Sequence, residues 1–309
     1  MQLRIGQFNL ENLFNRYRLL DHERGARTGK PVDPEKFVRE GGNINMLGWQ
    51  VEDFDTVSSA QRKATAKVIA RNAPDILAVQ EVENLFALES FARRFLKGLG
   101  YRYAAVLDGN DPRQIDVGVL SKYPITHLRS HKWLADEGGA RIFSRDCLEV
   151  DISIPKGPVA LFVNHFKSKI GGGNARRAAQ AQAVAAIVED RFDGTRGRLY
   201  ALIGDLNMEA DETEFAALSA MPLHNLIDTL PLEERWTHAY VKSKKKVEYR
   251  QFDHVLASPA LKSALRAVHI ERRGLQLAAA RFSGKRFSGV KERGTQASDH
   301  CGVFVDFEL

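Results

Sequence analysis

The chain of 309 residues is 44% hydrophobic and 27% charged, which excludes a disordered protein and leaves ample apolar material for a core. Its two cysteines, Cys147 and Cys301, are too few for a disulfide framework and lack the paired spacing of a zinc site. No stretch approaches the roughly 18 apolar residues of a membrane span, and the start shows no leader pattern. We expect a cytoplasmic protein without stable membrane association, or a secreted one if a leader has been trimmed.

Short apolar runs alternate with helical patterns, without a linker or a repeat, and this predicts one α/β domain over residues 1–309. Strands are expected over residues 3–9, 76–82, 116–121, 147–154, 159–166, 199–206, 251–257, 268–271 and 302–307. Helices are expected over residues 57–72, 85–97, 175–191, 212–220 and 259–266, the last with Ser258 as N-cap and Pro259 in its first turn. The polar segment 21–55 lacks periodicity and is expected to be a long surface excursion near the ligand.

The net charge of +6 is modest, but it is concentrated locally. Residues 242–250 hold five positive side chains and one acid, and residues 271–293 hold seven and two. Such clusters suit a polyanion such as nucleic acid, although the run Lys244 to Lys246 is equally typical of a solvated hairpin tip. The composition implies no protein partner.

Apolar strand runs repeatedly end in a carboxylate, an amide or a histidine. The residues in question are Asn9, Glu11, Glu81, Asn164, His165, Asp205, Asn207, Asp253, Asp299 and His300. Each alone also has a structural explanation, as a turn former, an N-cap, a satisfied buried histidine or an ion-pair partner. Because ligands of open α/β sheets bind at strand ends, the segments could converge on one site, whose oxygen ligands favour Mg²⁺ or Mn²⁺ over zinc.

In this order, the motifs resemble those of the endonuclease/exonuclease/phosphatase family of DNase I-like, metal-dependent phosphoesterases. The resemblance rests on Phe8-Asn9-Leu10-Glu11-Asn12, Gln80-Glu81-Val82, Gly204-Asp205-Leu206-Asn207, Phe252-Asp253-His254-Val255 and Ser298-Asp299-His300-Cys301. It implies a four-layered α/β sandwich, in which two mixed β-sheets pack face to face and helices cover both outer sides.

The resemblance also implies roles for the site residues. Glu81 would be the principal Mg²⁺ ligand, helped by Asn9, with Asp299 and Glu11 contributing directly or through water. Asp205 would orient or deprotonate the attacking water, and Asn207 would hold the phosphate or that water. His300, positioned by Asp253, would stabilise or protonate the phosphoryl oxygens, and Asn164-His165 resembles the DNase-like element that places a second histidine there.

Several cations lie beside the family segments and could either contact phosphates or be solvated surface charges. They are Arg113, Arg145, Lys167, Lys169 and Arg177. Lys167 and Lys169 are the strongest candidates, because they directly follow His165 and lead into the flexible run of residues 171–173.

The resemblance and the local basic charge favour a Mg²⁺-dependent endonuclease that acts on DNA with little sequence preference. Glu83 stands two residues after Glu81, where abasic-site enzymes usually have a lysine, so abasic-site specificity is not expected. The alternative is a phosphatase or phosphodiesterase for inositol phosphates, sphingolipids or small nucleotides. A non-catalytic binding module on the same scaffold is a remote third reading, since every expected metal and acid–base residue is present.

Neutralising Lys244, Lys245 and Lys246 together should weaken nucleic-acid binding and flatten its salt dependence, because fewer cations would displace counterions from the polyanion. Affinities measured across a salt series test this expectation. An unchanged slope would remove these lysines from the binding surface.

Overall fold

The computed structural model describes residues 1–14, 17–21, 30–31, 47–51, 59–192, 197–243 and 246–309. Most of the excursion expected over 21–55, and Lys244 and Lys245, lie outside these residues. The described pieces near the excursion pair as a small three-stranded sheet, composed of β2 (Tyr17–Asp21), β3 (Lys30–Pro31) and β4 (Leu47–Val51).

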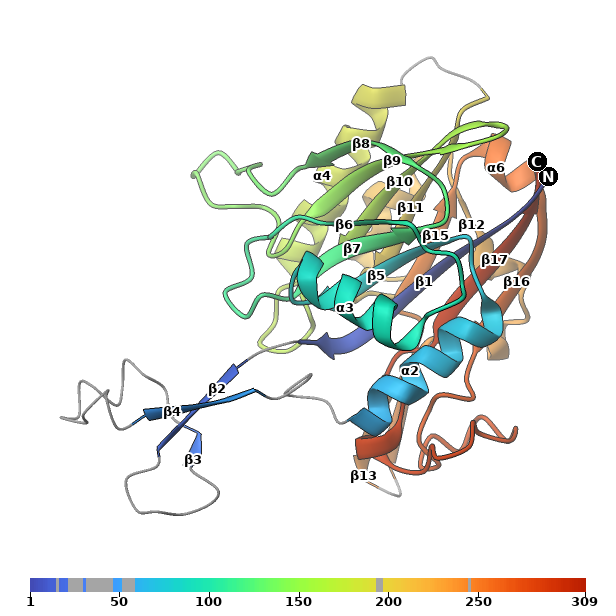
Figure 1. Ribbon diagram of the computed structural model, residues 1–309. Helices are drawn as coiled ribbons and strands as arrows, with labels where there is room; N and C mark the ends of the chain where they lie inside the picture. Colours follow the sequence, from blue (N-terminus) through green and yellow to red (C-terminus); the bar gives the residue numbers. More distant parts are fainter. Residues whose placement is uncertain (15–16, 22–29, 32–46, 52–58, 193–196, 244–245) are drawn as a thin grey trace.

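Two mixed sheets of six strands each pack face to face (Figure 1). The first sheet, in spatial order, contains β16 (Leu265–Glu271), β17 (Gly302–Glu308), β1 (Gln2–Leu13), β5 (Ile76–Val82), β7 (Asp116–Ser121) and β6 (Tyr103–Val106). The second contains β12 (His224–Asn225), β15 (Asp253–Ala257), β11 (Leu199–Asp205), β10 (Gly157–His165), β9 (Cys147–Ile154) and β8 (Ile125–Ser130). Each sheet has one parallel pair, β1 with β5 and β10 with β11.

Helices cover the two outer faces. The helices are α2 (Ser59–Asn72) and α3 (Leu85–Phe95) on the first sheet, and α4 (Asn174–Phe192), α5 (Ala216–Ser219) and α6 (Pro259–Ser263) beside the second. The described residues also contain short 3₁₀ turns, at Thr213–Phe215, Leu226–Thr229, Leu232–Glu234 and Arg293–Thr295. Within this part of the chain, no helix is long and apolar enough to cross a bilayer.

Side-chain alternation along the strands creates three apolar layers. Ile5 and Ile203 belong to the cluster between the sheets, while Phe8 packs with the residues of α2 and α3, and Phe162 with those of α4. Helix–sheet–sheet–helix layering confirms the predicted four-layered α/β sandwich.

The last predicted helix is too long. Ser258 caps α6 as expected, its side chain accepting a hydrogen bond from the Leu261 amide, but α6 ends at Ser263. Leu265 already pairs with Phe307 of β17, so the expected strand at 268–271 begins earlier, as β16. The sequence also missed β6 and β8, two edge strands whose residues are partly exposed and therefore lack a strong apolar pattern.

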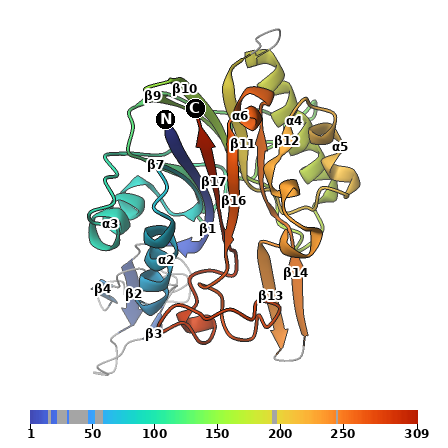
Figure 2. The same cartoon turned by 90° about the vertical axis from the view of Figure 1, so that its right-hand side faces the viewer.

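The strands on either side of Lys244 and Lys245 pair as a hairpin, whose tip lies outside the described residues. Its strands are β13 (His238–Ser243) and β14 (Lys246–Arg250), which form a sheet of their own at one end of the molecule (Figure 2). The two chain ends lie together at the other end of the body (Figures 1 and 2). There the terminal amino group of Met1 donates a hydrogen bond to the Leu309 carbonyl at 2.6 Å.

Gly204 occupies a position that only glycine fits. Its φ is +143°, and a Cβ atom there would lie 2.0 Å from the Asn164 carbonyl oxygen of the neighbouring strand β10. The close approach lies immediately before Asp205, so the glycine of the motif Gly204-Asp205-Leu206-Asn207 sets the path of the chain into that residue.

Gly204→Ala should destabilise the fold by about 4 kcal/mol or more, because backbone strain adds to a clash with main-chain atoms. Gly157→Ala is the matched control: Gly157 also has a positive φ, +105°, but its added Cβ would meet nothing within 4 Å. Gly157→Ala should lower the free energy of unfolding by only about 1–2 kcal/mol, because it adds backbone strain without a clash. Urea unfolding of both variants measures the difference, and equal losses would contradict the clash.

Candidate active site

The inter-sheet rows of apolar side chains become polar at one edge. Because alternate residues face the same way, the row of Leu3 and Ile5 in β1 continues as Gln7 and Asn9. In the same way, the rows of β10, β11 and β15 end in His165, Asp205 and Asp253. These side chains have almost no exposed surface. The structure thus gathers polar groups where the inter-sheet core ends.

Glu81 reaches this edge because β5 is irregular there. Strict alternation would turn Glu81 to the face occupied by Leu77 and Val79, under the helices. Instead, the pairing of β5 with β7 shifts between Gln80 and Val82, and Glu81 has a φ of +60°. A bulge of this kind re-aims one side chain, and here it brings the carboxylate to the other acids.

Asn9 links the acids of the two sheets. Its Nδ2 donates to Glu81 Oε1 at 3.3 Å and to Asp205 Oδ2 at 3.1 Å. The Asn12 amide donates to Glu81 Oε2 at 3.0 Å, and Asn9 Oδ1 accepts from the Glu11 amide at 3.0 Å. The amide side chain thereby fixes the spacing of two carboxylates that would otherwise repel.

Buried Arg62 of α2 holds the backbone after Asn9. Its guanidinium donates to the carbonyls of Leu10 at 2.9 Å and of Glu11 and Asn12 at 3.0 Å. Glu11 and Asn12 both have positive φ values, 47° and 59°, so these donations support a strained turn. Burial lowers the pKa of Arg62 to about 10. The sequence analysis did not single out this residue.

His300 and Asp253 form a hydrogen-bonded pair. His300 Nδ1 lies 2.8 Å from Asp253 Oδ2, and Asp253 Oδ1 accepts from Gln7 Nε2 at 2.7 Å. Gln7 also donates to Gln80 Oε1 at 2.7 Å. The two glutamines were not predicted as site residues, although Gln7 lies two positions before Asn9 and alternation places it on the same face.

Asp205 lies between the two imidazoles. Its Oδ2 is 3.6 Å from His300 Nε2 and 3.4 Å from His165 Nε2. Asn207 donates from its amide to Asp205 Oδ1 at 2.9 Å, and from Nδ2 to the Phe166 carbonyl at 3.2 Å. Asp205 therefore faces groups from two other strands, β1 and β10, and from the segments that carry Asn207 and His300.

The environment separates the protonation states of the two imidazoles. Burial opposes the charge on His300, but Asp253 and Asp205 raise its pKa well above the usual value. Burial, together with Arg145 and His300, lowers the pKa of His165 well below it. The surroundings thus favour the charged form of His300 and the neutral form of His165.

The carboxylates are crowded as well as buried. Burial raises the pKa of Asp205 to about 6, against the opposing effect of His300. Burial, with Asp299 and Glu81 nearby, raises the pKa of Glu11 to about 8. Burial and Asp299 also raise the pKa of Glu81. A cluster of oxygen donors that resists ionisation in this way is the environment that a hard divalent cation relieves.

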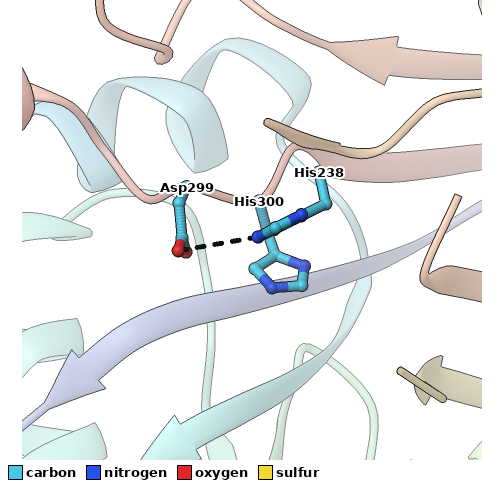
Figure 3. A group of neighbouring side chains, drawn as sticks. All are labelled: His238, Asp299 and His300. Carbon is cyan, nitrogen blue, oxygen red and sulfur yellow. Dashed lines mark ion pairs between the residues drawn. The ribbon is translucent and has the colours of Figure 1, made fainter. Parts of the chain in front are cut away.

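His238 joins the site from hairpin β13–β14. Its Nε2 lies 3.7 Å from Asp299 Oδ2, and its ring centroid lies 4.6 Å from that of His300 (Figure 3). Ligand atoms of His238, Asp299 and His300 lie within 4.8 Å of one another, as do those of Asp205, Asp253 and His300. His238 lies outside the five family motifs, so its position at the candidate site could not be predicted from the sequence.

Four of the cations predicted to contact substrate are each held by an acidic side chain or a backbone carbonyl of the protein. Buried Arg145 lies 3.0 Å from Asp111 and donates to the Phe166 carbonyl, and Arg113 also pairs with Asp111, from a more exposed position. Lys169 pairs with Glu212. Lys167 Nζ donates to the Ile170 carbonyl at 3.1 Å.

Two of the predicted substrate contacts need correction. Arg177 is buried, and its guanidinium donates to the Lys167 carbonyl and to Asn174 Oδ1, so it supports the loop after β10. Asn164 has the opposite orientation to His165 because neighbouring strand residues alternate, and its Nδ2 donates to the Phe162 carbonyl. The structure therefore does not bring Asn164 and Arg177 among the site residues.

The fold and the sequence were compared with known proteins. Truncated TDP2 from Caenorhabditis elegans has a similar structure, with a TM-score of 0.61 at 14% identity, covering 100% of this chain and 98% of that one. TDP2 from D. rerio, complexed with a single-strand DNA product, gives 0.60 at 15% identity, with 100% and 99% covered. The human Nocturnin catalytic domain with bound sulfate gives 0.60 at 14% identity, with 99% and 94% covered.

At such low identities these likenesses show the fold alone. No curated protein matches the sequence. The sequence profile of the Endonuclease/Exonuclease/phosphatase family, however, matches residues 43–300, which is most of the chain and includes Glu81, Asp205, Asp253 and His300. The chain belongs to the endonuclease/exonuclease/phosphatase family.

Proposed function

We propose that the protein is a Mg²⁺-dependent phosphodiesterase that cleaves nucleic acid, with DNA of little sequence preference as its substrate. One observation carries the proposal: Asp205 lies 3.6 Å from the Nε2 of an imidazole that Asp253 keeps charged. A carboxylate and an imidazolium side by side are the acid–base pair that hydrolysis of a phosphodiester requires.

Hydrolysis needs a proton removed from water and a proton supplied to the leaving oxygen. Asp205, whose pKa of about 6 suits a base near neutral pH, takes the proton as the water oxygen attacks phosphorus. His300 donates a proton as the bond from phosphorus to the leaving oxygen breaks. Asn207, held by Asp205 and the Phe166 carbonyl, orients the water or a phosphoryl oxygen, and neutral His165 offers a further hydrogen bond.

Members of this family typically use divalent metals, and the oxygen-rich donor set fits one. Glu81 would hold the ion with Asn9, and Asp299 and Glu11 would contribute directly or through water; Mn²⁺ could replace Mg²⁺. When bound, the ion supplies electrostatic stabilisation of the charge that develops on phosphoryl oxygens. The raised pKa values of Glu81 and Glu11 support this assignment, since a cation offsets carboxylate repulsion.

Basic local charge favours nucleic acid over small phosphoesters. The hairpin β13–β14 and the segment 271–293 both carry cations in excess. One structurally similar protein, D. rerio TDP2, holds a single-strand DNA product. These observations support DNA as the substrate.

Purified protein should nick supercoiled plasmid in Mg²⁺ or Mn²⁺ and not in EDTA. Glu81→Ala and His300→Ala should each lower the rate at least about 100-fold, because one removes the ion's main ligand and the other the proton donor. Running the variants beside the wild type excludes a contaminating nuclease. If a protein that binds Mg²⁺ nicks nothing, the nuclease proposal is wrong and small or lipid phosphoesters become the substrates to test.

Mg²⁺ should also raise the thermal unfolding midpoint of the wild type, by an amount corresponding to about 2.7 kcal/mol at 100 times its dissociation constant. Glu81→Gln should lose most of this stabilisation, since one carboxylate ligand is gone. Glu189→Gln, an exposed change on α4, should keep it. Calorimetry with and without the ion makes the comparison, and equal stabilisation of both variants would place the ion elsewhere.

A further inference from the structure

Hairpin β13–β14 has two chemically different faces. Ala239 belongs to the inter-sheet core, and its cross-strand partner Tyr249 packs against that core. Alternation therefore assigns the opposite face to His238, Tyr240, Glu248 and Arg250. The pairing is irregular at Lys242, but its contacts with Glu248 and the Tyr240 ring place it on the same face. This second face carries one exposed aromatic ring between cations. It continues directly into the candidate active site, because His238 belongs to both.

Three aromatic residues form a row toward the acid–base pair, which we call the aromatic row: Tyr240, His238 and Phe252. The rings of Tyr240 and His238 have centroids 6.5 Å apart and planes only 9° apart, and His238 and Phe252 are 5.1 Å apart at 28°. His238 also contacts His300, whose centroid is 4.6 Å away. The row thus begins at a ring, Tyr240, that is 49% exposed, and its middle member, His238, lies beside the proposed proton donor.

Hydrogen bonds fix this row to Asp253 and to the segment that carries His300. The Ala239 amide donates to the Asp299 carbonyl at 3.0 Å, and the Cys301 amide donates to the Thr237 carbonyl. Thr237 Oγ1 accepts from the Asp253 amide at 3.1 Å. The residues on both sides of His238 are therefore tied to Asp253 and His300, so Tyr240 has a set position relative to the reacting centre.

Cations flank the row at both ends. Lys242 Nζ lies 5.9 Å from the Tyr240 ring centroid, and Lys169 Nζ lies 5.5 Å from that of Phe252. Both lysines pair with acids, Glu248 and Glu212, but they remain partly exposed. Phosphates attract such cations, and bases stack on exposed aromatic faces, so this combination matches the two repeating chemical groups of a nucleic-acid strand.

We propose that Tyr240 stacks on an unpaired base of single-stranded nucleic acid next to the scissile phosphate, while Lys242 and Lys169 face the flanking phosphates. This inference rests on the proposed function and narrows its substrate. A base inside a duplex has both faces covered by its neighbours, so only an unpaired or frayed strand can offer a face to Tyr240.

The test measures binding and cleavage separately. Fluorescence anisotropy in EDTA, where the proposed cleavage cannot proceed, gives the affinity of the full-length protein for a labelled single-stranded oligonucleotide. Tyr240→Ala should weaken it about tenfold, and Tyr240→Phe, which keeps the ring, less than twofold. Tyr103→Ala is the matched control: Tyr103 is also exposed, but it pairs with Ser121 at the end of the first sheet away from Glu81, and its loss should change nothing.

A second oligonucleotide of the same length carries abasic tetrahydrofuran residues in place of nucleosides. Tyr240→Ala should bind it as the wild type does, because no base remains to stack. Equal loss on both oligonucleotides, no loss on either, or a wild type that binds neither would overturn the inference.

Cleavage of the same strands in Mg²⁺ separates the two proposals. If nothing is cleaved but the base-dependent binding loss appears, the nuclease proposal fails and the stacking role stands. If the strands are cleaved and Tyr240→Ala binds and cleaves them like the wild type, only the stacking role fails.

Discussion

Burial of polar groups at the edge of the inter-sheet core is the constraint on which the site depends. Gln7, Asn9, Asp205 and Asp253 continue rows of apolar side chains, and they have almost no access to water. Such groups are costly to bury without hydrogen-bond partners, and the hydrogen bonds from Gln7 to Asp253 and from Asn9 to Asp205 link them across the two sheets. The packing that stabilises the sandwich therefore also sets the distances between the side chains of the candidate site.

The same constraint explains the local irregularities. Glu81 must leave the regular alternation of β5 to meet Asn9, and the chain bulges at that point. The turn at Glu11 and Asn12 is strained, and Arg62 offsets the cost with three donated hydrogen bonds. Strain of this kind gathers where a fold positions charged groups, because regular strands alone cannot point enough side chains to one place.

Much of the architecture could be predicted from local pattern. The apolar runs next to Asn9, Asp205 and Asp253 indicate both the strands and the edge of the sheets where the candidate site lies. The orientation of Glu81 could not be predicted, because a bulge depends on the pairing with β7. His238 and Arg62 depend on contacts with residues far away in the sequence. Asn164 and Arg177 show the same limit. Strand alternation turns Asn164 away from the face of its neighbour His165, and Arg177 instead donates to the Lys167 carbonyl.

The pairing of the first strand with the last has a consequence for the order of folding. β1 carries Asn9, and along one side it is hydrogen bonded to β17, the final strand of the described chain. During synthesis, β1 emerges from the ribosome long before β17, so this pairing cannot form until almost all of the described chain has been made. Its contacts have the longest sequence separation available, which slows the closing step of folding. Asn9 on β1 and His300, which precedes β17, are thus brought together late in folding, so the candidate site is complete only when the sandwich is.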